Sequence, residues 1–179
     1  MRKTVWTFGL IAGGILSVMM LLTMPFIDSI GWENGEVIGY TTMVLAFLLI
    51  FFGVRQYRDN VLGGSVTFGR AFKAGALIAL VASVCYVVTW EVIYFKIRPD
   101  FGAKFEEMML EQVKAEAGTP EELAKQVAEF ERFAEMYKNP VINAAITFIE
   151  PLPIGLLIAL VSAFMLSRQR PSFPRGSSP

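Results

Sequence analysis

Four long runs of apolar residues, separated by polar segments, dominate the pattern of this chain. A helix needs about 20 mostly apolar residues, at roughly 1.5 Å of rise each, to cross the hydrocarbon layer of a membrane. The runs are long enough, and the pattern predicts transmembrane helices over 5–27, 37–54, 71–95 and 141–166. We therefore expect an all-α membrane protein with a single four-helix transmembrane domain over residues 1–179.

The polar segment between the third and fourth runs, residues 96–140, carries two apolar stripes with the spacing of a helix. Thr119-Pro120-Glu121-Glu122 has an N-cap residue, a proline at the first helical position and a glutamate three residues after the cap, so a second helix starts there. The stripes predict an extracytoplasmic helical hairpin, with a helix lying on lipid headgroups as the alternative and a partner-binding arm as a functional interpretation. Their members are Phe101, Phe105, Met108, Met109 and Val113, then Leu123, Val127, Phe130, Ala134 and Tyr137.

The composition supports a membrane protein and excludes several kinds of chemistry. Hydrophobic residues make up 54% of the chain, and the formal net charge of +0 gives no overall basic character for binding nucleic acid. The chain has no His, and this absence removes the commonest general base and the commonest transition-metal ligand. It has one cysteine, Cys85. We find no catalytic constellation, and expect neither an enzyme nor a metal or cofactor site.

The basic residues indicate the orientation of the spans. Arg2, Lys3 and the segment from Arg55 to Lys73 are basic, as is the tail over 167–179, whereas the segments 28–36 and 96–140 are acidic on balance. Loops rich in Lys and Arg stay in the cytoplasm. We therefore expect cytoplasmic N- and C-termini, a disordered cytoplasmic tail over 167–179, and location in a bacterial inner membrane.

Small residues recur every four positions in three of the runs. Such stripes let two helix backbones approach closely, within one chain or between chains of a homo-oligomer, and both possibilities stay open. The stripes are Gly9, Gly13 and Ser17; Ala71, Gly75, Ala79 and Ser83; and Gly155, Ala159 and Ala163.

Glu150 is the acidic residue that lies deepest in an apolar run, counted from the outer end of that run. Pro151 and Pro153 break the backbone hydrogen bonds beside it, and such a break next to an intramembrane acid often forms a polar site. Glu36 and Glu91 lie at a comparable depth when the spans are counted from their basic ends. The pattern gives a candidate proton or cation site. The alternative for Glu150 is a hydrogen-bonded or protonated glutamate in a kinked helix, and for Glu36 and Glu91 it is a place in the outer headgroup layer without a partner.

The segment from Gly64 to Ala71 has the glycine spacing of a phosphate-binding loop, but Arg70 stands where that motif needs Lys. No strand is predicted before it, so we expect no nucleotide. Arg70 and Lys73 are instead predicted to lie on lipid headgroups at the entry of the third span.

Three stretches together resemble the DUF4199 family of bacterial membrane proteins. They are Gly63-Gly64-Ser65-Val66-Thr67-Phe68-Gly69-Arg70-Ala71-Phe72-Lys73-Ala74-Gly75, the Tyr-rich end from Tyr86 to Phe95, and Phe148-Ile149-Glu150-Pro151-Leu152-Pro153-Ile154-Gly155. The resemblance implies a small integral inner-membrane protein with a helical extracytoplasmic insertion. It brings no established activity, substrate or catalytic residue.

Two functional hypotheses follow from these patterns. The first is a non-enzymatic structural or accessory component of the cell envelope, whose partners are the lipid bilayer and a membrane protein or a second copy. The second is a small oligomeric transporter or channel with a carboxylate site at Glu150.

Overall fold

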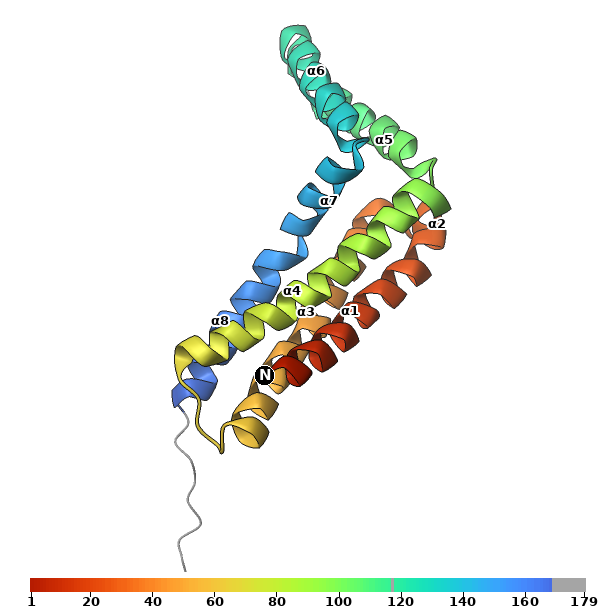
Figure 1. Ribbon diagram of the computed structural model, residues 1–179. Helices are drawn as coiled ribbons and strands as arrows, with labels where there is room; N and C mark the ends of the chain where they lie inside the picture. Colours follow the sequence, from red (N-terminus) through yellow and green to blue (C-terminus); the bar gives the residue numbers. More distant parts are fainter. Residues whose placement is uncertain (117, 169–179) are drawn as a thin grey trace, which may run out of the picture. The chain divides into compact units, whose positions relative to one another are not determined.

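The computed structural model describes residues 1–116 and 118–168, and all regular structure in this part of the chain is helical (Figure 1). The helices are α1 (Arg2–Thr23), the 3₁₀ turn η1 (Met24–Phe26), α2 (Ile27–Ile30), α3 (Trp32–Gln56), the π-helical turn η2 (Tyr57–Val61), α4 (Phe68–Val92), the π-helical turn η3 (Ile93–Ile97), α5 (Phe101–Glu116), α6 (Pro120–Tyr137), α7 (Pro140–Ile149) and α8 (Pro151–Arg168). The predicted all-α class is confirmed for these residues. The tail predicted over 167–179 lies outside them, apart from Ser167 and Arg168, which belong to α8.

Four helical segments are long and apolar enough to cross a membrane, as the apolar runs predict. They are Arg2–Ile30, Trp32–Val61, Phe68–Ile97 and Pro140–Arg168. Each extends beyond its predicted span, because backbone hydrogen bonds continue through polar residues at the helix ends. Leu62 N–H, for example, donates to Tyr57 O at 3.2 Å, so the helix continues past the polar residues that follow α3.

The chain forms two compact units. Of the described residues, the first unit contains 1–86 and 150–168, and the second lies within 87–149. α4 therefore contributes to both, and the boundary near the C-terminus falls between α7 and α8.

In the first unit, α3 contacts both α1 and α8, and α4 completes the core. Phe47, Ile50 and Ile78 are fully buried there. By contrast, only 22–33% of the most apolar stretch of each candidate span is buried. Most apolar side chains of these helices thus face outward, which is the surface that a lipid bilayer covers.

The small-residue stripes lie at close helix contacts within the first unit. A Cβ added at Gly13 of α1 would lie 2.6 Å from the Cβ of Cys85 in α4. A Cβ at Gly155 of α8 would lie 2.7 Å from the Cβ of Ala79, and one at Gly75 would lie 2.9 Å from the Cβ of Ala159. The stripes of α1 and α8 therefore both pack on α4 inside one chain.

The remaining members of the three stripes are buried to different degrees. A Cβ at Gly9 would meet Val81, while Ala71, Ala159 and Ala163 are fully buried. Ser17 is half-buried. Ser83 is also fully buried, and its hydroxyl has no hydrogen-bond partner among the described residues.

In the second unit, α5 contacts α6, and α6 contacts α7. The predicted helix start at Thr119 is confirmed, because its Oγ1 accepts a hydrogen bond from Glu122 N–H at 3.2 Å. Of the apolar stripe of α5, Phe101 is buried and packs edge to face on Trp90, with ring centroids 5.2 Å apart. Tyr94 and Tyr137 extend this aromatic core, with centroids 5.5 Å apart.

Candidate functional site

Glu150 is the single turn residue between α7 and α8, so the helix is interrupted where Pro151 and Pro153 follow. Pro151 is buried and Pro153 is exposed. The Glu150 side chain is half-buried, and its Oε2 accepts a hydrogen bond from the Tyr86 hydroxyl at 2.9 Å. A phenol thus satisfies part of the hydrogen-bonding capacity of the carboxyl group, which lowers the cost of placing it among apolar residues.

Two residues of α3 belong to the same electrostatic environment. Glu36 and Tyr40 both interact electrostatically with Glu150. Glu36 is exposed and Tyr40 is 42% exposed, so this side of the group is open to the surroundings. The first unit therefore places Glu36 within electrostatic range of Glu150. It adds Tyr86, which begins the Tyr-rich end, and Tyr40, which the sequence pattern does not single out.

Glu91 lies in the second unit. It is half-buried, and its Oε1 is shielded from solvent with no hydrogen-bond partner among the described residues. A joint site of Glu91 with Glu150 stays a prediction. Within residues 1–116 and 118–168 no group of three or more His, Cys, Asp or Glu side chains is arranged to hold a metal ion.

The second unit contains a buried polar network. Asn143 of α7 is fully buried, and its Oδ1 accepts a hydrogen bond from Trp90 Nε1 at 3.0 Å. Its Nδ2 donates to the backbone oxygen of Tyr137 at 3.2 Å, and its Oδ1 also accepts from Thr147 Oγ1 at 3.3 Å. The Tyr137 hydroxyl lies 3.0 Å from Thr147 Oγ1 and accepts from Trp90 Nε1 at 3.2 Å. The network links α4, α6 and α7.

This network is not among the features predicted from the sequence, although the sequence contains one signal for it. Asn143 and Thr147 are polar residues four positions apart inside the apolar run 141–166, which puts both on one face of a helix. Polar side chains in such a position hydrogen-bond to neighbouring helices. Their partners, Trp90 and Tyr137, are far away in the sequence and follow only from the structure.

Ion pairs at the edge of the second unit keep two exposed groups charged. The Arg98 guanidinium hydrogen-bonds to Asp100 at 3.3 Å and lowers the pKa of that carboxyl group below its usual value. The Glu135 carboxylate lies 2.7 Å from Lys138 Nζ and raises the pKa of that amine. Neither pKa moves towards neutrality, so these groups are not suited to proton transfer near pH 7.

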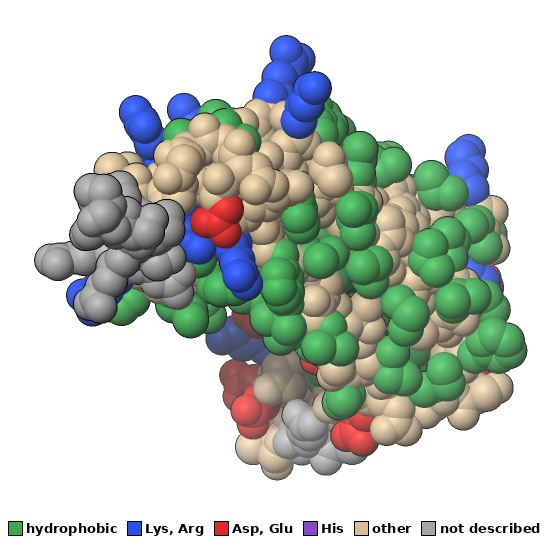
Figure 2. All heavy atoms as spheres, turned by 90° about the horizontal axis from the view of Figure 1, so that it is seen from below, with side chains coloured by type: hydrophobic (Ala, Val, Ile, Leu, Met, Phe, Trp, Pro, Cys, Tyr) green, Lys and Arg blue, Asp and Glu red, His purple; other side chains and the backbone are tan. Residues whose placement is uncertain are grey.

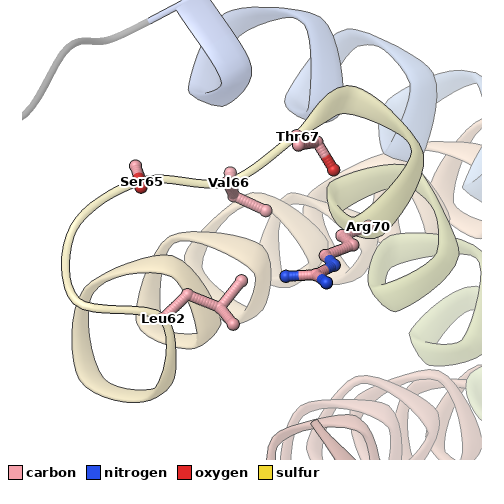
Figure 3. A pocket seen from close by; sticks show the side chains of 5 residues that line it. All are labelled: Leu62, Ser65, Val66, Thr67 and Arg70. Atoms are coloured by element: carbon pink, nitrogen blue, oxygen red, sulfur yellow. The ribbon is translucent and has the colours of Figure 1, made fainter.

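Arg70 and Lys73, predicted to lie on lipid headgroups, are both exposed in the first turns of α4. Arg70 lines a pocket at the loop that precedes this helix, together with Leu62, Ser65, Val66 and Thr67 (Figure 3). Lys73 is not among the residues that line it.

A comparison with protein families identifies the chain. The model of the family described as "Protein of unknown function (DUF4199)" matches residues 7–168, which is nearly the whole chain. The chain belongs to the DUF4199 family. No curated protein and no solved structure matches it. The predicted resemblance is thus confirmed, and the family match includes both the Glu150 turn and the loop pocket of this DUF4199 protein.

Proposed function

We propose that this DUF4199 protein is a non-enzymatic integral protein of the bacterial inner membrane and an accessory component of a larger envelope assembly. The observation that carries this proposal is the surface of α6. Phe133 and Met136 are 39% and 46% exposed on this otherwise polar helix. Aromatic and methionine side chains are enriched at protein contact surfaces, and here they stand on a helix pair outside the apolar spans.

The charge pattern supports an orientation with both termini and the loop 62–67 in the cytoplasm. Arg2, Lys3, Arg55, Arg58 and Arg70 lie at these positions, where short basic loops are retained on the inner side. On this topology α5 and α6 form an extracytoplasmic helical hairpin. A protein that reaches out of the membrane in this way is able to contact a membrane-protein partner, or a second copy of itself, on the outer side.

This proposal is tested by photo-crosslinking in intact cells. A photoreactive residue at position 133 is expected to give a crosslinked product with one membrane protein, whereas the same residue at Glu131, which is exposed on the other side of α6, gives none. Co-purification of that partner in mild detergent is expected to be lost in the double variant Phe133→Ser, Met136→Ser and kept in Ala124→Ser, Ala128→Ser. Equal crosslinking from both positions, or none, would contradict a contact surface on α6.

A second function, a small oligomeric transporter or channel, is favoured by one specific observation. The hydrogen bond between Tyr86 and Glu150 lies at the helix interruption, where a carboxyl group is able to take up and release a proton or hold a cation. Glu36, which interacts with Glu150, gives this group a second carboxylate towards the exposed side.

For the transporter hypothesis, Glu150→Gln is the decisive variant. Glutamine keeps an oxygen that accepts from Tyr86 but cannot release a proton. In proteoliposomes that enclose a pH-sensitive dye, we expect proton flux above that of empty liposomes for the wild type and flux at the empty-liposome level for Glu150→Gln. The control Glu33→Gln removes an exposed carboxylate in the first turn of α3, away from the Glu150 turn in the sequence, and is expected to retain the proton flux. A wild type that equals empty liposomes would refute transport of protons.

A further inference from the structure

The loop between η2 and α4 borders an open pocket of about 240 Å³ lined by Leu62, Ser65, Val66, Thr67 and Arg70, which we call the loop pocket. In Figure 3 the Arg70 side chain extends from α4 towards the loop, and the hydroxyl oxygen of Thr67 points in the direction of Arg70. The lining of the pocket thus combines a guanidinium with the hydroxyl-bearing residues Ser65 and Thr67 and the apolar residues Leu62 and Val66.

Backbone geometry holds this loop in place. Gly63 and Gly64 have φ angles of 71° and 96°, which other residues rarely adopt, and Gly64 N–H donates to Arg58 O at 2.9 Å. Val66 is 8% exposed and belongs to the core of the first unit, so it anchors the extended segment. Thr67 O accepts from Ala71 N–H at 3.0 Å at the start of α4. Arg70, three residues after Thr67, is therefore on the same side.

The acidic residue near the pocket is paired with other arginines, so the Arg70 guanidinium is available to bind an external anion. Asp59 is the single acidic residue between Arg55 and Lys73. It is already bound by Arg58 at 2.6 Å and by Arg55 at 3.6 Å. Among residues 1–116 and 118–168, no ion pair or side-chain hydrogen bond of Arg70 occurs.

The chemistry of the pocket fits a phosphate group. A guanidinium binds two oxygens of a phosphate at once, and hydroxyl groups donate to the remaining ones. The volume is below the roughly 300–1,000 Å³ of pockets that bury a drug-sized ligand, and it is large enough for a phosphate group whose remaining part extends out of the open side.

The place of the pocket decides the source of the phosphate. It lies at the end of two candidate spans, and the first turns of α4, which carry Arg70, also carry the stacked rings of Phe68 and Phe72, whose centroids are 6.1 Å apart. Aromatic residues at such a position lie at the level of lipid headgroups. Figure 2 shows Lys and Arg side chains at several places around this end of the molecule, a distribution that attracts anionic lipids. We propose that the loop pocket binds the phosphate of an anionic phospholipid headgroup.

The test must separate a specific pocket from general attraction of basic residues to the membrane. The purified full chain is placed in neutral detergent with phosphatidylglycerol, phosphatidylcholine or inorganic phosphate, and retained lipid is measured by native mass spectrometry. We expect phosphatidylglycerol to bind and to be retained more strongly than phosphatidylcholine. Removal of one charge that contacts a lipid phosphate weakens binding about fivefold, and this is the expected effect of Arg70→Gln.

Two further variants give the decisive comparison. Thr67→Val removes a hydroxyl of the pocket without changing charge and is expected to weaken phosphatidylglycerol binding, whereas Arg2→Gln, which removes an exposed charge outside the pocket, is expected to change it less than twofold. If Arg70→Gln and Arg2→Gln weaken phosphatidylglycerol binding equally and Thr67→Val leaves it unchanged, the proposed lipid site at the loop pocket is refuted. Displacement of the lipid by an equal concentration of inorganic phosphate would show that the site takes free phosphate and would overturn the lipid assignment.

Discussion

Replacing Gly13 by leucine is expected to lower the free energy of unfolding by about 3 kcal/mol, at the upper end of the usual cost of overpacking. A Cβ at this position would lie 2.6 Å from Cys85 Cβ and 3.2 Å from the backbone Cα of Ala82. Real Cβ atoms do not approach this closely, and the backbone of α4 cannot move aside as a flexible side chain would. α1 and α4 must therefore separate, which also weakens the contacts along the rest of the interface.

The adjacent glycine provides a matched control. Gly14 is exposed on the same helix, and a Cβ there would meet nothing within 4 Å. Leucine is a better helix former than glycine by roughly 0.5–1 kcal/mol, so Gly14→Leu is expected to leave stability unchanged or to raise it. Both variants add the same side chain to the same helix. Thermal unfolding in mild detergent measures them, and about 3 kcal/mol corresponds to a fall in Tm of roughly 6–12 °C. Equal Tm values for the two variants would contradict the close packing of α1 on α4.

The sequence was sufficient to predict the spans because the requirement of a bilayer is local. Length and apolar character are properties of one segment, and they locate all four candidate spans. The ends are less accurate, since helical hydrogen bonding continues through polar residues such as Arg58 and Asp59, which a criterion of apolar character excludes. The N-cap of α6 at Thr119 is also predictable from the sequence, because a helix cap depends on residues within three positions of it.

The candidate site could be predicted only in part, because its contacts are not local. Glu150 stands out in the sequence as an acid in an apolar run, but its hydrogen-bond partner Tyr86 is 64 residues away. In the same way, a stripe of small residues predicts that a helix packs closely but not on which neighbour. That the stripes of α1 and α8 both meet α4 follows from the tertiary arrangement of the first unit.

The second large effect is expected from Asn143→Leu, in the second unit. The two side chains have similar volume, so the variant removes hydrogen bonds while it keeps the packing. The backbone oxygen of Tyr137 then loses the Asn143 Nδ2 donor, and Trp90 Nε1 keeps only the Tyr137 hydroxyl. A buried polar group without its partner costs about 1–3 kcal/mol. We expect the free energy of unfolding of this unit to fall by about 2 kcal/mol.

The expected loss should be seen where α4, α6 and α7 meet. Hydrogen exchange is expected to accelerate at the end of α6 and the start of α7. Ala145→Leu, which adds apolar volume at an exposed position of the same helix, is expected to have little effect. Thr147→Val is expected to cost less than Asn143→Leu, because it removes one member of the network while the bond from Trp90 to Asn143 at 3.0 Å remains.

A double-mutant cycle between Trp90→Phe and Asn143→Leu separates the network from a simple loss of packing. If the indole and the amide stabilise the unit through their shared hydrogen bond, the effects of the two substitutions are not additive, and the coupling energy is about 1 kcal/mol. Additive effects would mean that each residue acts through its own apolar contacts. Trp90 is the best partner for this cycle because its indole N–H donates to both Asn143 and Tyr137 and so joins α4 to the other two helices of the network. Phenylalanine at this position retains an aromatic ring for the contact with Phe101 but lacks the N–H donor.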